Sequence, residues 1–158
     1  MIPATLAGIA RHAAPRAAME TLERALITPE LGVEGDCKGV FKPGKRNRRQ
    51  VTLIEAGDWA AALAELGATL PWWERRANLL VEGLDLPQRA GAILRIGGVR
   101  LEITTECDPC ERMDALIPGL RAALRPDWRG GACARVLSGG MVAIGDTIEI
   151  ESFGELAA

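Results

Sequence analysis

Two cysteines separated by two residues form the segment best suited to chemistry, Cys107-Asp108-Pro109-Cys110. The motif follows an apolar stretch that ends at residue 104, and it precedes a segment of helical spacing that begins at Glu111. A thiol at a helix N-terminus lies near unpaired backbone N–H groups and the positive end of the helix dipole, which favour the thiolate. We therefore expect Cys110 to ionise more readily than an ordinary cysteine and to act as a metal ligand or a nucleophile.

The other cysteines are expected to have lesser roles. Cys107 stands between Glu106 and Asp108, whose negative charges should oppose its ionisation. Cys133 lies in an apolar segment and is expected to be buried and inert. Three interpretations stay open for the Cys-x-x-Cys pair: a functional thiolate with a supporting neighbour, a dithiol redox pair, or two ordinary buried thiols. A four-cysteine zinc site would need a second ligand pair, and Cys37 is isolated.

Arginines stand directly before two predicted strands. Arg49 ends a basic run over residues 42–49 and precedes the apolar residues 50–54, while Arg75-Arg76-Ala77-Asn78 leads into residues 79–81. Guanidinium groups held at neighbouring strand ends can grip a phosphate with paired hydrogen bonds. We expect Arg49 and Arg76 to converge on one anion site, and the rest of the basic run to be a solvated loop.

Several other polar and aromatic residues are assigned structural positions. His12 has no acid or nucleophile near it in the sequence and is expected at the surface, and Asp36 is expected to cap backbone within a turn. Trp72 and Trp73 are expected to close one end of the sheet as a hydrophobic plug.

Short apolar runs and glycine pairs predict a mainly β fold. Strands are expected over residues 5–11, 50–54, 78–81, 92–96, 99–104, 134–138, 141–144 and 147–151. Gly97-Gly98 and Gly139-Gly140 each predict a two-residue hairpin. Helices are expected over residues 55–66 and over 111–124, the latter broken at Pro118-Gly119, with a short helix over 21–26. The class is a strongly bent sheet or β-barrel with a few helices.

Size and charge limit the possible functions. The 158 residues form a single predicted domain over positions 1–158, and the formal charge of −2 provides no global field for nucleic acid. No apolar run approaches the ~20 residues needed to span a bilayer. The first ten residues lack the pattern of a secretory signal, so a cytoplasmic location is expected.

Six blocks, in order, resemble the MOSC domain, the module named for the C-terminal part of molybdenum cofactor sulfurases. They are Gly32-Val33-Glu34-Gly35-Asp36, Arg49-Gln50-Val51-Thr52-Leu53, Arg76-Ala77-Asn78-Leu79-Leu80-Val81-Glu82-Gly83, Ile96-Gly97, Pro109-Cys110-Glu111-Arg112, and Ala134-Arg135-Val136-Leu137 through Gly139-Gly140 to Gly145-Asp146. The resemblance implies a strongly bent β-barrel in which Cys110 is the functional cysteine. It also implies that an arginine at the position of Arg76, or its neighbour Arg75, helps to hold the anionic part of a cofactor.

The resemblance implies binding of molybdenum cofactor or a related metal–sulfur species at Cys110, with Arg49, Asn78 and Arg112 as further cofactor contacts. Two mechanisms follow: a molybdenum-dependent reductase of N-hydroxylated compounds, or a sulfur carrier with a persulfide on Cys110. Whether the chain is an enzyme stays open, because a non-enzymatic cofactor-binding or regulatory module fits the same residues. Expected partners are the cofactor, a sulfur donor protein or an electron-transfer protein. Pyridoxal phosphate, a family association, is not expected here, since lysines stand at 38, 42 and 45 alone.

Overall fold

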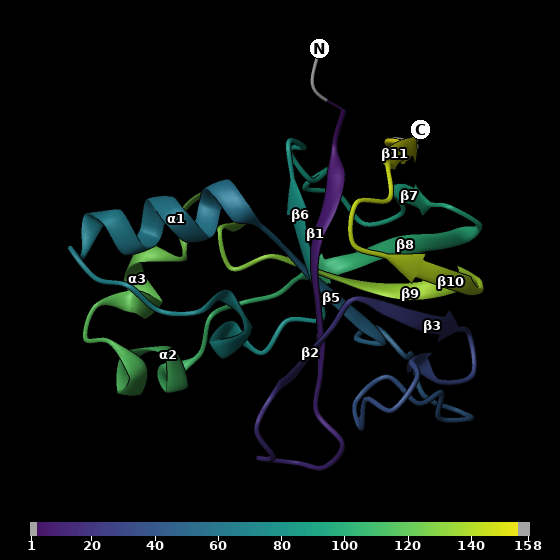
Figure 1. Cartoon of the computed structure of the whole chain (residues 1–158), viewed down its shortest axis with the longest axis horizontal. Helices are drawn as coiled ribbons and strands as arrows, with labels where there is room; N and C mark the ends of the chain where they lie inside the picture. Colours follow the sequence, from purple (N-terminus) through teal and green to yellow (C-terminus); the bar gives the residue numbers. More distant parts are fainter. Residues whose placement is uncertain (1–2, 155–158) are drawn as a thin grey trace.

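The structure is a computed structural model that describes residues 3–154, and strands make up most of its regular secondary structure. Two sheets form the body, and three short α-helices gather on one side of them (Figure 1). The larger sheet has eight strands in the order β11-β7-β8-β9-β5-β6-β1-β2, and the smaller has three in the order β10-β3-β4. The mainly β class predicted from the sequence is confirmed.

The strands of the larger sheet are β1 (Thr5–Arg11), β2 (Glu20–Leu22), β5 (Val51–Glu55), β6 (Leu79–Glu82), β7 (Ile93–Ile96), β8 (Val99–Glu106), β9 (Ala132–Ser138) and β11 (Ile148–Ser152). The smaller sheet contains β3 (Arg24–Thr28), β4 (Gly32–Val33) and β10 (Gly140–Ala143). The helices are α1 (Ala56–Glu65), α2 (Glu111–Leu116) and α3 (Leu120–Ala123), with 3-10 turns at Trp72–Arg75 and Pro126–Trp128.

The larger sheet bends strongly, but it is not closed into a barrel. Its two ends approach where Thr5 of β1 pairs with Thr147, just before β11, in an isolated bridge. Farther along, the same edge of β1 is paired with β2 through residues 9–11. The bridge stays isolated while β11 continues along β7, and the sheet stays open.

Two apolar clusters lie on opposite faces of the central strands. On β5, Leu53 belongs to the core between the sheets, whereas Ile54 belongs to the core under the helices. This alternation is the period of two that a strand buried on both faces requires. In the helical cluster, Trp59 and Leu63 of α1 pack with Met113 of α2. The helices are thereby held against the sheet edge at which the polar residues gather.

Three of the local predictions can be compared directly. The Gly97-Gly98 hairpin is confirmed, because Ile96 of β7 pairs with Val99 of β8. The helix after residue 110 is broken as expected, since Pro118-Gly119 separates α2 from α3 and Gly119 has φ of 91°. A short 3-10 turn places Trp72 in the helical core, where its ring lies so close to Gly8 that a Cβ there would be 2.6 Å away.

Two local predictions are wrong. Residues 21–26 form parts of β2 and β3 rather than a helix, because pairing with β1 and β10 outweighs the local preference. Gly139-Gly140 is not a hairpin turn, because β10 leaves β9 and pairs with β3. A Cβ at Gly139 would lie 2.7 Å from the Ile27 carbonyl oxygen, so this glycine allows close approach of two backbones.

Within residues 3–154, no helix has the length and apolar character needed to cross a bilayer.

Candidate functional site

A polar cleft of about 510 Å³ lies where several strand ends meet α2. His12 follows β1, Arg49 precedes β5, and Cys107 and Cys110 lie between β8 and α2. Its lining residues are His12, Asp36, Lys38, Arg49, Thr52, Arg75, Arg76, Asn78, Cys107, Asp108, Cys110, Glu111, Arg112 and Met113. The cleft therefore collects two thiols and most of the site residues predicted from the sequence.

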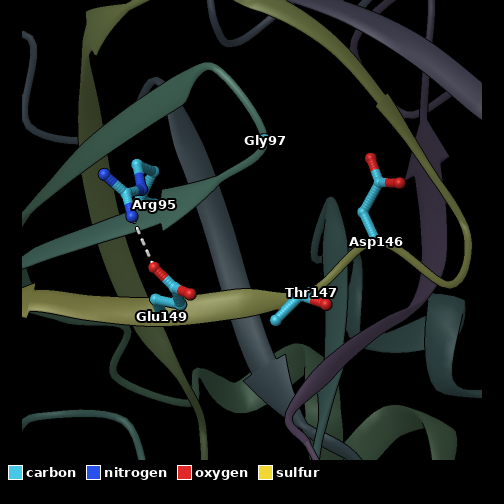
Figure 2. Close-up of a pocket in the computed structure, with 5 residues that line it drawn as sticks. All are labelled: Arg95, Gly97, Asp146, Thr147 and Glu149. Carbon is cyan, nitrogen blue, oxygen red and sulfur yellow. Dashed lines mark hydrogen bonds and ion pairs between the residues drawn. The ribbon is translucent and has the colours of Figure 1, made fainter.

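A second depression, of about 420 Å³, lies at the other end of the larger sheet (Figure 2). Arg95 and Glu149, on neighbouring strands, form an ion pair at 2.5 Å, and Gly97, Asp146 and Thr147 complete the lining. Both side chains of the pair are about half exposed to solvent. With its charges paired and no thiol or imidazole in the lining, this depression offers little for catalysis.

The side chain of Arg75 lines the polar cleft and is held in place by hydrogen bonds to the backbone. Its Nε donates to the Gly130 carbonyl oxygen at 3.1 Å, and its Nη2 donates to the Cys107 carbonyl oxygen at 2.8 Å. The same Nη2 lies 3.4 Å from Cys107 Sγ. Glycine at 130 permits this packing, because a Cβ there would lie 2.6 Å from the Cys107 carbonyl oxygen. Arg75 is buried and its donors are directed at the chain itself.

Arg49 contacts the sulfur atoms of two cysteines on the side of the cleft that contains Arg75. Its Nη2 lies 3.5 Å from Cys107 Sγ, and its Nε lies 3.4 Å from Cys133 Sγ. A hydrogen bond from the Cys133 thiol, together with the charges of Arg75 and Arg49, outweighs burial and lowers the pKa of Cys107 to about 5. The same hydrogen bond and burial raise the pKa of Cys133.

The prediction that Glu106 and Asp108 would oppose ionisation of Cys107 is wrong. Guanidinium groups from distant parts of the chain contact the sulfur, and their effect exceeds that of the sequence neighbours. Cys110, at the N-cap of α2, is exposed and lines the cleft, as expected. Cys133 is fully buried, also as expected.

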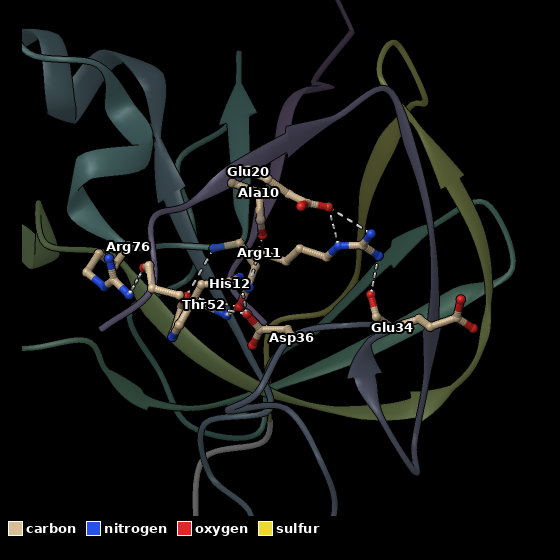
Figure 3. A network of polar contacts seen from close by, with 10 residues as sticks. Ala10, Arg11, His12, Glu20, Glu34, Asp36, Thr52 and Arg76 are labelled. Atoms are coloured by element: carbon tan, nitrogen blue, oxygen red, sulfur yellow. Dashed lines mark hydrogen bonds and ion pairs between the residues drawn. The ribbon is translucent and has the colours of Figure 1, made fainter. Parts of the chain in front are cut away.

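His12 lies on a different wall and contradicts the sequence-based prediction of a surface residue. Its residue surface is 3% exposed, and Asp36 Oδ1 accepts from its backbone N–H at 3.1 Å. The Nδ1 atom lies 3.3 Å from the same carboxylate oxygen (Figure 3). Burial lowers the pKa of His12, Asp36 opposes this, and the charges of Arg76, Lys38 and Arg112 add to the lowering. Asp36 does cap backbone, as predicted.

Arg76 turns away from its neighbour Arg75. It has φ of 66°, in the left-handed region, where it caps the 3-10 turn through its backbone N–H to the Trp73 carbonyl oxygen. Its Nη2 donates to the Ala17 carbonyl oxygen at 2.8 Å. In residues 3–154, the buried side-chain nitrogen and oxygen atoms without a hydrogen-bond partner are Arg76 Nε and the two ring nitrogens of His12. All three atoms belong to residues that line the cleft.

Two further predicted contacts are also in the lining. Asn78 accepts from the backbone N–H of Thr52 at 3.0 Å and donates to the Ala10 carbonyl oxygen at 3.1 Å, so it ties β1, β5 and β6 together. Arg112 lies on α2, two residues after Cys110. Arg49 and Arg76 line the same cleft, and their convergence on one anion stays a prediction. His12 and Asp36 were missed as site residues because 24 positions separate them in the chain.

Comparisons with known proteins identify the family. The family model described as MOSC domain matches residues 38–149. The chain therefore belongs to the MOSC domain family, which is related to the C-terminal domain of molybdenum cofactor sulfurases. A comparison with curated protein sequences finds no match.

Solved structures share the fold at low sequence identity. The YuaD protein from Bacillus subtilis superposes with a TM-score of 0.73 at 22% identity, over 93% of this chain and 94% of that one. YiiM from Geobacillus stearothermophilus gives 0.69 at 14% identity, over 94% of this chain and 75% of that one. YiiM from Escherichia coli gives 0.67 at 16% identity, over 98% and 72%. At these identities the likeness establishes the fold.

Proposed function

We propose that the polar cleft binds molybdenum cofactor and that Cys110 is the protein ligand to the metal. The observation that carries the proposal is the position of Cys110: an exposed thiol at the mouth of a cleft whose lining contains four arginines and a lysine. A soft thiolate suits molybdenum, and guanidinium groups suit the phosphate of a pterin cofactor.

The donor set fits such a group. Arg76 Nε and the ring nitrogens of His12 are buried without a partner, although buried polar groups are normally satisfied. A ligand that fills the cleft would supply partners for them. Arg75, in contrast, is engaged by Gly130 and Cys107, so Arg76 is the better candidate for the contact that the family resemblance assigns to one of the two arginines.

Each residue has a distinct role in this proposal. Cys110 binds the metal, while Arg76 and Arg112 bind the anionic part of the cofactor. Asn78 does not contact it but holds three strands in register behind the cleft. Once bound, the cofactor would supply two-electron redox chemistry at its metal.

Metal analysis tests this proposal. The chain is produced in a host that makes molybdenum cofactor, purified gently, and assayed for molybdenum and for pterin fluorescence. We expect both in wild type, their loss in Cys110→Ser, and their retention in Cys37→Ser, a matched control because Cys37 is partly buried and does not line the cleft. Absence of both from wild type would contradict the proposal. Loaded protein is then assayed for reduction of N-hydroxylated compounds, which separates a reductase from a binding module.

A sulfur carrier is the second candidate, because the exposure of Cys110 makes it reachable by a sulfur donor protein. In this function a persulfide forms on Cys110, and Arg112 stabilises its terminal sulfur. Mass spectrometry of protein treated with a persulfide donor would then show one added sulfur on Cys110 without bound metal.

A further inference from the structure

A second thiol in the cleft has an environment that the proposed role of Cys110 does not explain. Cys107 is 7% exposed and lines the cleft, and its Sγ lies 3.4 Å from Arg75 Nη2 and 3.5 Å from Arg49 Nη2. Two guanidinium donors directed at one sulfur atom favour an anion there, because a neutral thiol is a poor acceptor.

The charges of the two arginines support this interpretation. Within residues 3–154, neither Arg49 nor Arg75 forms an ion pair with a carboxylate. Arg75 is buried, and a buried cation without a counter-ion is strongly unfavourable. A thiolate at Cys107 supplies the missing negative charge. A neutral thiol at Cys107 would leave the buried Arg75 guanidinium without a counter-charge.

We propose that Cys107 is a second reactive thiol of the cleft, present as a thiolate and oxidised by hydrogen peroxide to a sulfenic acid. The Cys107 sulfur attacks one peroxide oxygen, forming an S–O bond as the O–O bond breaks. The sulfur loses two electrons, and the departing hydroxide takes a proton from solvent to become water. Arg49 and Arg75 hold the sulfur in its anionic, nucleophilic form before the attack.

This reactivity is separate from the proposed binding of cofactor by Cys110. Cys110 is exposed and has no arginine donor on its sulfur in the described residues, so it lacks the arrangement that stabilises Cys107. Cys133 is fully buried and keeps its proton. Oxidation at low peroxide is therefore expected to be selective for Cys107, even in protein that carries no cofactor.

The test combines two measurements on the full chain free of cofactor. Thiolate absorbance in the ultraviolet is titrated with pH in wild type, Cys107→Ser and Cys110→Ser. We expect a transition near pH 5 in wild type and Cys110→Ser that is missing from Cys107→Ser. After brief exposure to peroxide with dimedone, which traps sulfenic acids, peptide mapping should place the adduct on Cys107.

Arg49→Gln provides a second variant in case Cys107→Ser fails to fold. Loss of one donor should raise the pKa of Cys107, and a rise of about one unit from about 5 lowers the thiolate fraction at pH ~5, and with it the rate of dimedone capture, by about fivefold. Arg95→Gln, at the other end of the sheet, should leave the rate unchanged. A wild-type protein without the transition near pH 5, or with the adduct on Cys110 alone, would overturn the proposal. Loss of molybdenum binding in Cys110→Ser has no bearing on these results.

Discussion

Two walls of the same cleft satisfy their polar groups in opposite ways. On the wall formed by Arg49, Arg75, Cys107 and Cys133, guanidinium donors are directed at sulfur atoms and backbone carbonyl oxygens of the chain. On the wall formed by His12, Asp36 and Arg76, both imidazole nitrogens and one guanidinium nitrogen have no hydrogen-bond partner, although Nδ1 lies 3.3 Å from the Asp36 carboxylate. We call these the thiolate wall and the imidazole wall.

The two walls differ in how far the chain itself satisfies their polar groups. A buried polar group without a partner costs about 1–3 kcal/mol, so a folded chain keeps few of them outside functional sites. The donors of the thiolate wall that contact carbonyl oxygens and sulfur atoms carry no such cost. Under the proposed function, the imidazole wall is the side on which a ligand would complete the hydrogen bonding.

Breaking the thiolate wall should have the largest effect on stability. Arg75→Leu removes the donors to two buried carbonyl oxygens and a counter-ion of the Cys107 thiolate. Removing one partner of a buried charge pair costs about 3–5 kcal/mol, and we expect a loss of this size in the free energy of unfolding. Chemical denaturation measures it. Arg95→Leu, which breaks an exposed ion pair, should cost less than about 1 kcal/mol. Equal losses in the two variants would show that the thiolate wall does not hold the fold.

On the imidazole wall, substitution should affect binding more than stability. Arg76→Asn keeps a residue that tolerates the left-handed conformation but removes the free Nε donor. We expect affinity for inorganic phosphate to fall by roughly tenfold, the value of one charge-assisted hydrogen bond. Isothermal titration calorimetry measures the affinity. Unchanged binding would remove Arg76 from the anion site.

The protonation of His12 gives a smaller but more direct signal. His12 is the single histidine of the chain, so its imidazole resonances in an NMR spectrum are unambiguous. Its pKa is lowered by burial and by the charges of Arg76, Lys38 and Arg112, and we expect a titration midpoint below the usual value of about 6.5. Bound phosphate should raise that midpoint by offsetting the positive charges. A midpoint that phosphate does not move would place the anion elsewhere.

The same titration predicts how stability varies with pH. Between the lowered pKa of folded His12 and the unfolded value of about 6.5, the unfolded chain binds more protons than the folded one. Stability should therefore rise with pH across this window. His12→Gln should remove that rise, and unfolding curves measured at several pH values would show whether it does.

Alkylation at neutral pH compares an exposed thiol with a buried one and leaves stability and binding aside. Cys110 should be labelled well before Cys133, because Cys133 is fully buried and has a raised pKa. Peptide mass spectrometry over time gives both rates. Faster labelling of Cys133 would contradict the described packing of β9.

Local patterns predicted much of the fold. Alternating apolar residues gave β1 with its observed bounds, and the helix break at Pro118-Gly119 followed from the missing proline donor. The conformation of Gly139-Gly140 could not be predicted from local sequence. It depends on the pairing of β10 with β3, and the paired residues are more than a hundred positions apart in the sequence. Whether the sheet closes into a barrel could not be predicted either, because closure depends on pairing between β1 and β11, which are more than a hundred positions apart in the sequence.

The sequence indicated which residues belong to the candidate site better than it indicated how they are arranged. Cys110, Arg49 and Arg76 do line one cleft, since motifs at strand ends meet at a common edge of the sheet. The state of Cys107 was not predictable, because Arg75 and Arg49 reach it from 32 and 58 positions away. The burial of His12 likewise depends on Asp36, which belongs to a different part of the chain.

Molybdenum content compared between two variants tests the division of roles between the two cleft cysteines most directly. Cys110→Ser and Cys107→Ser are produced in the same cofactor-competent host as wild type and are assayed for molybdenum per chain after their folding has been confirmed by circular dichroism. We predict that Cys110→Ser loses the metal and that Cys107→Ser retains much of it. Full retention of molybdenum in Cys110→Ser, or equal loss in both variants, would contradict the account.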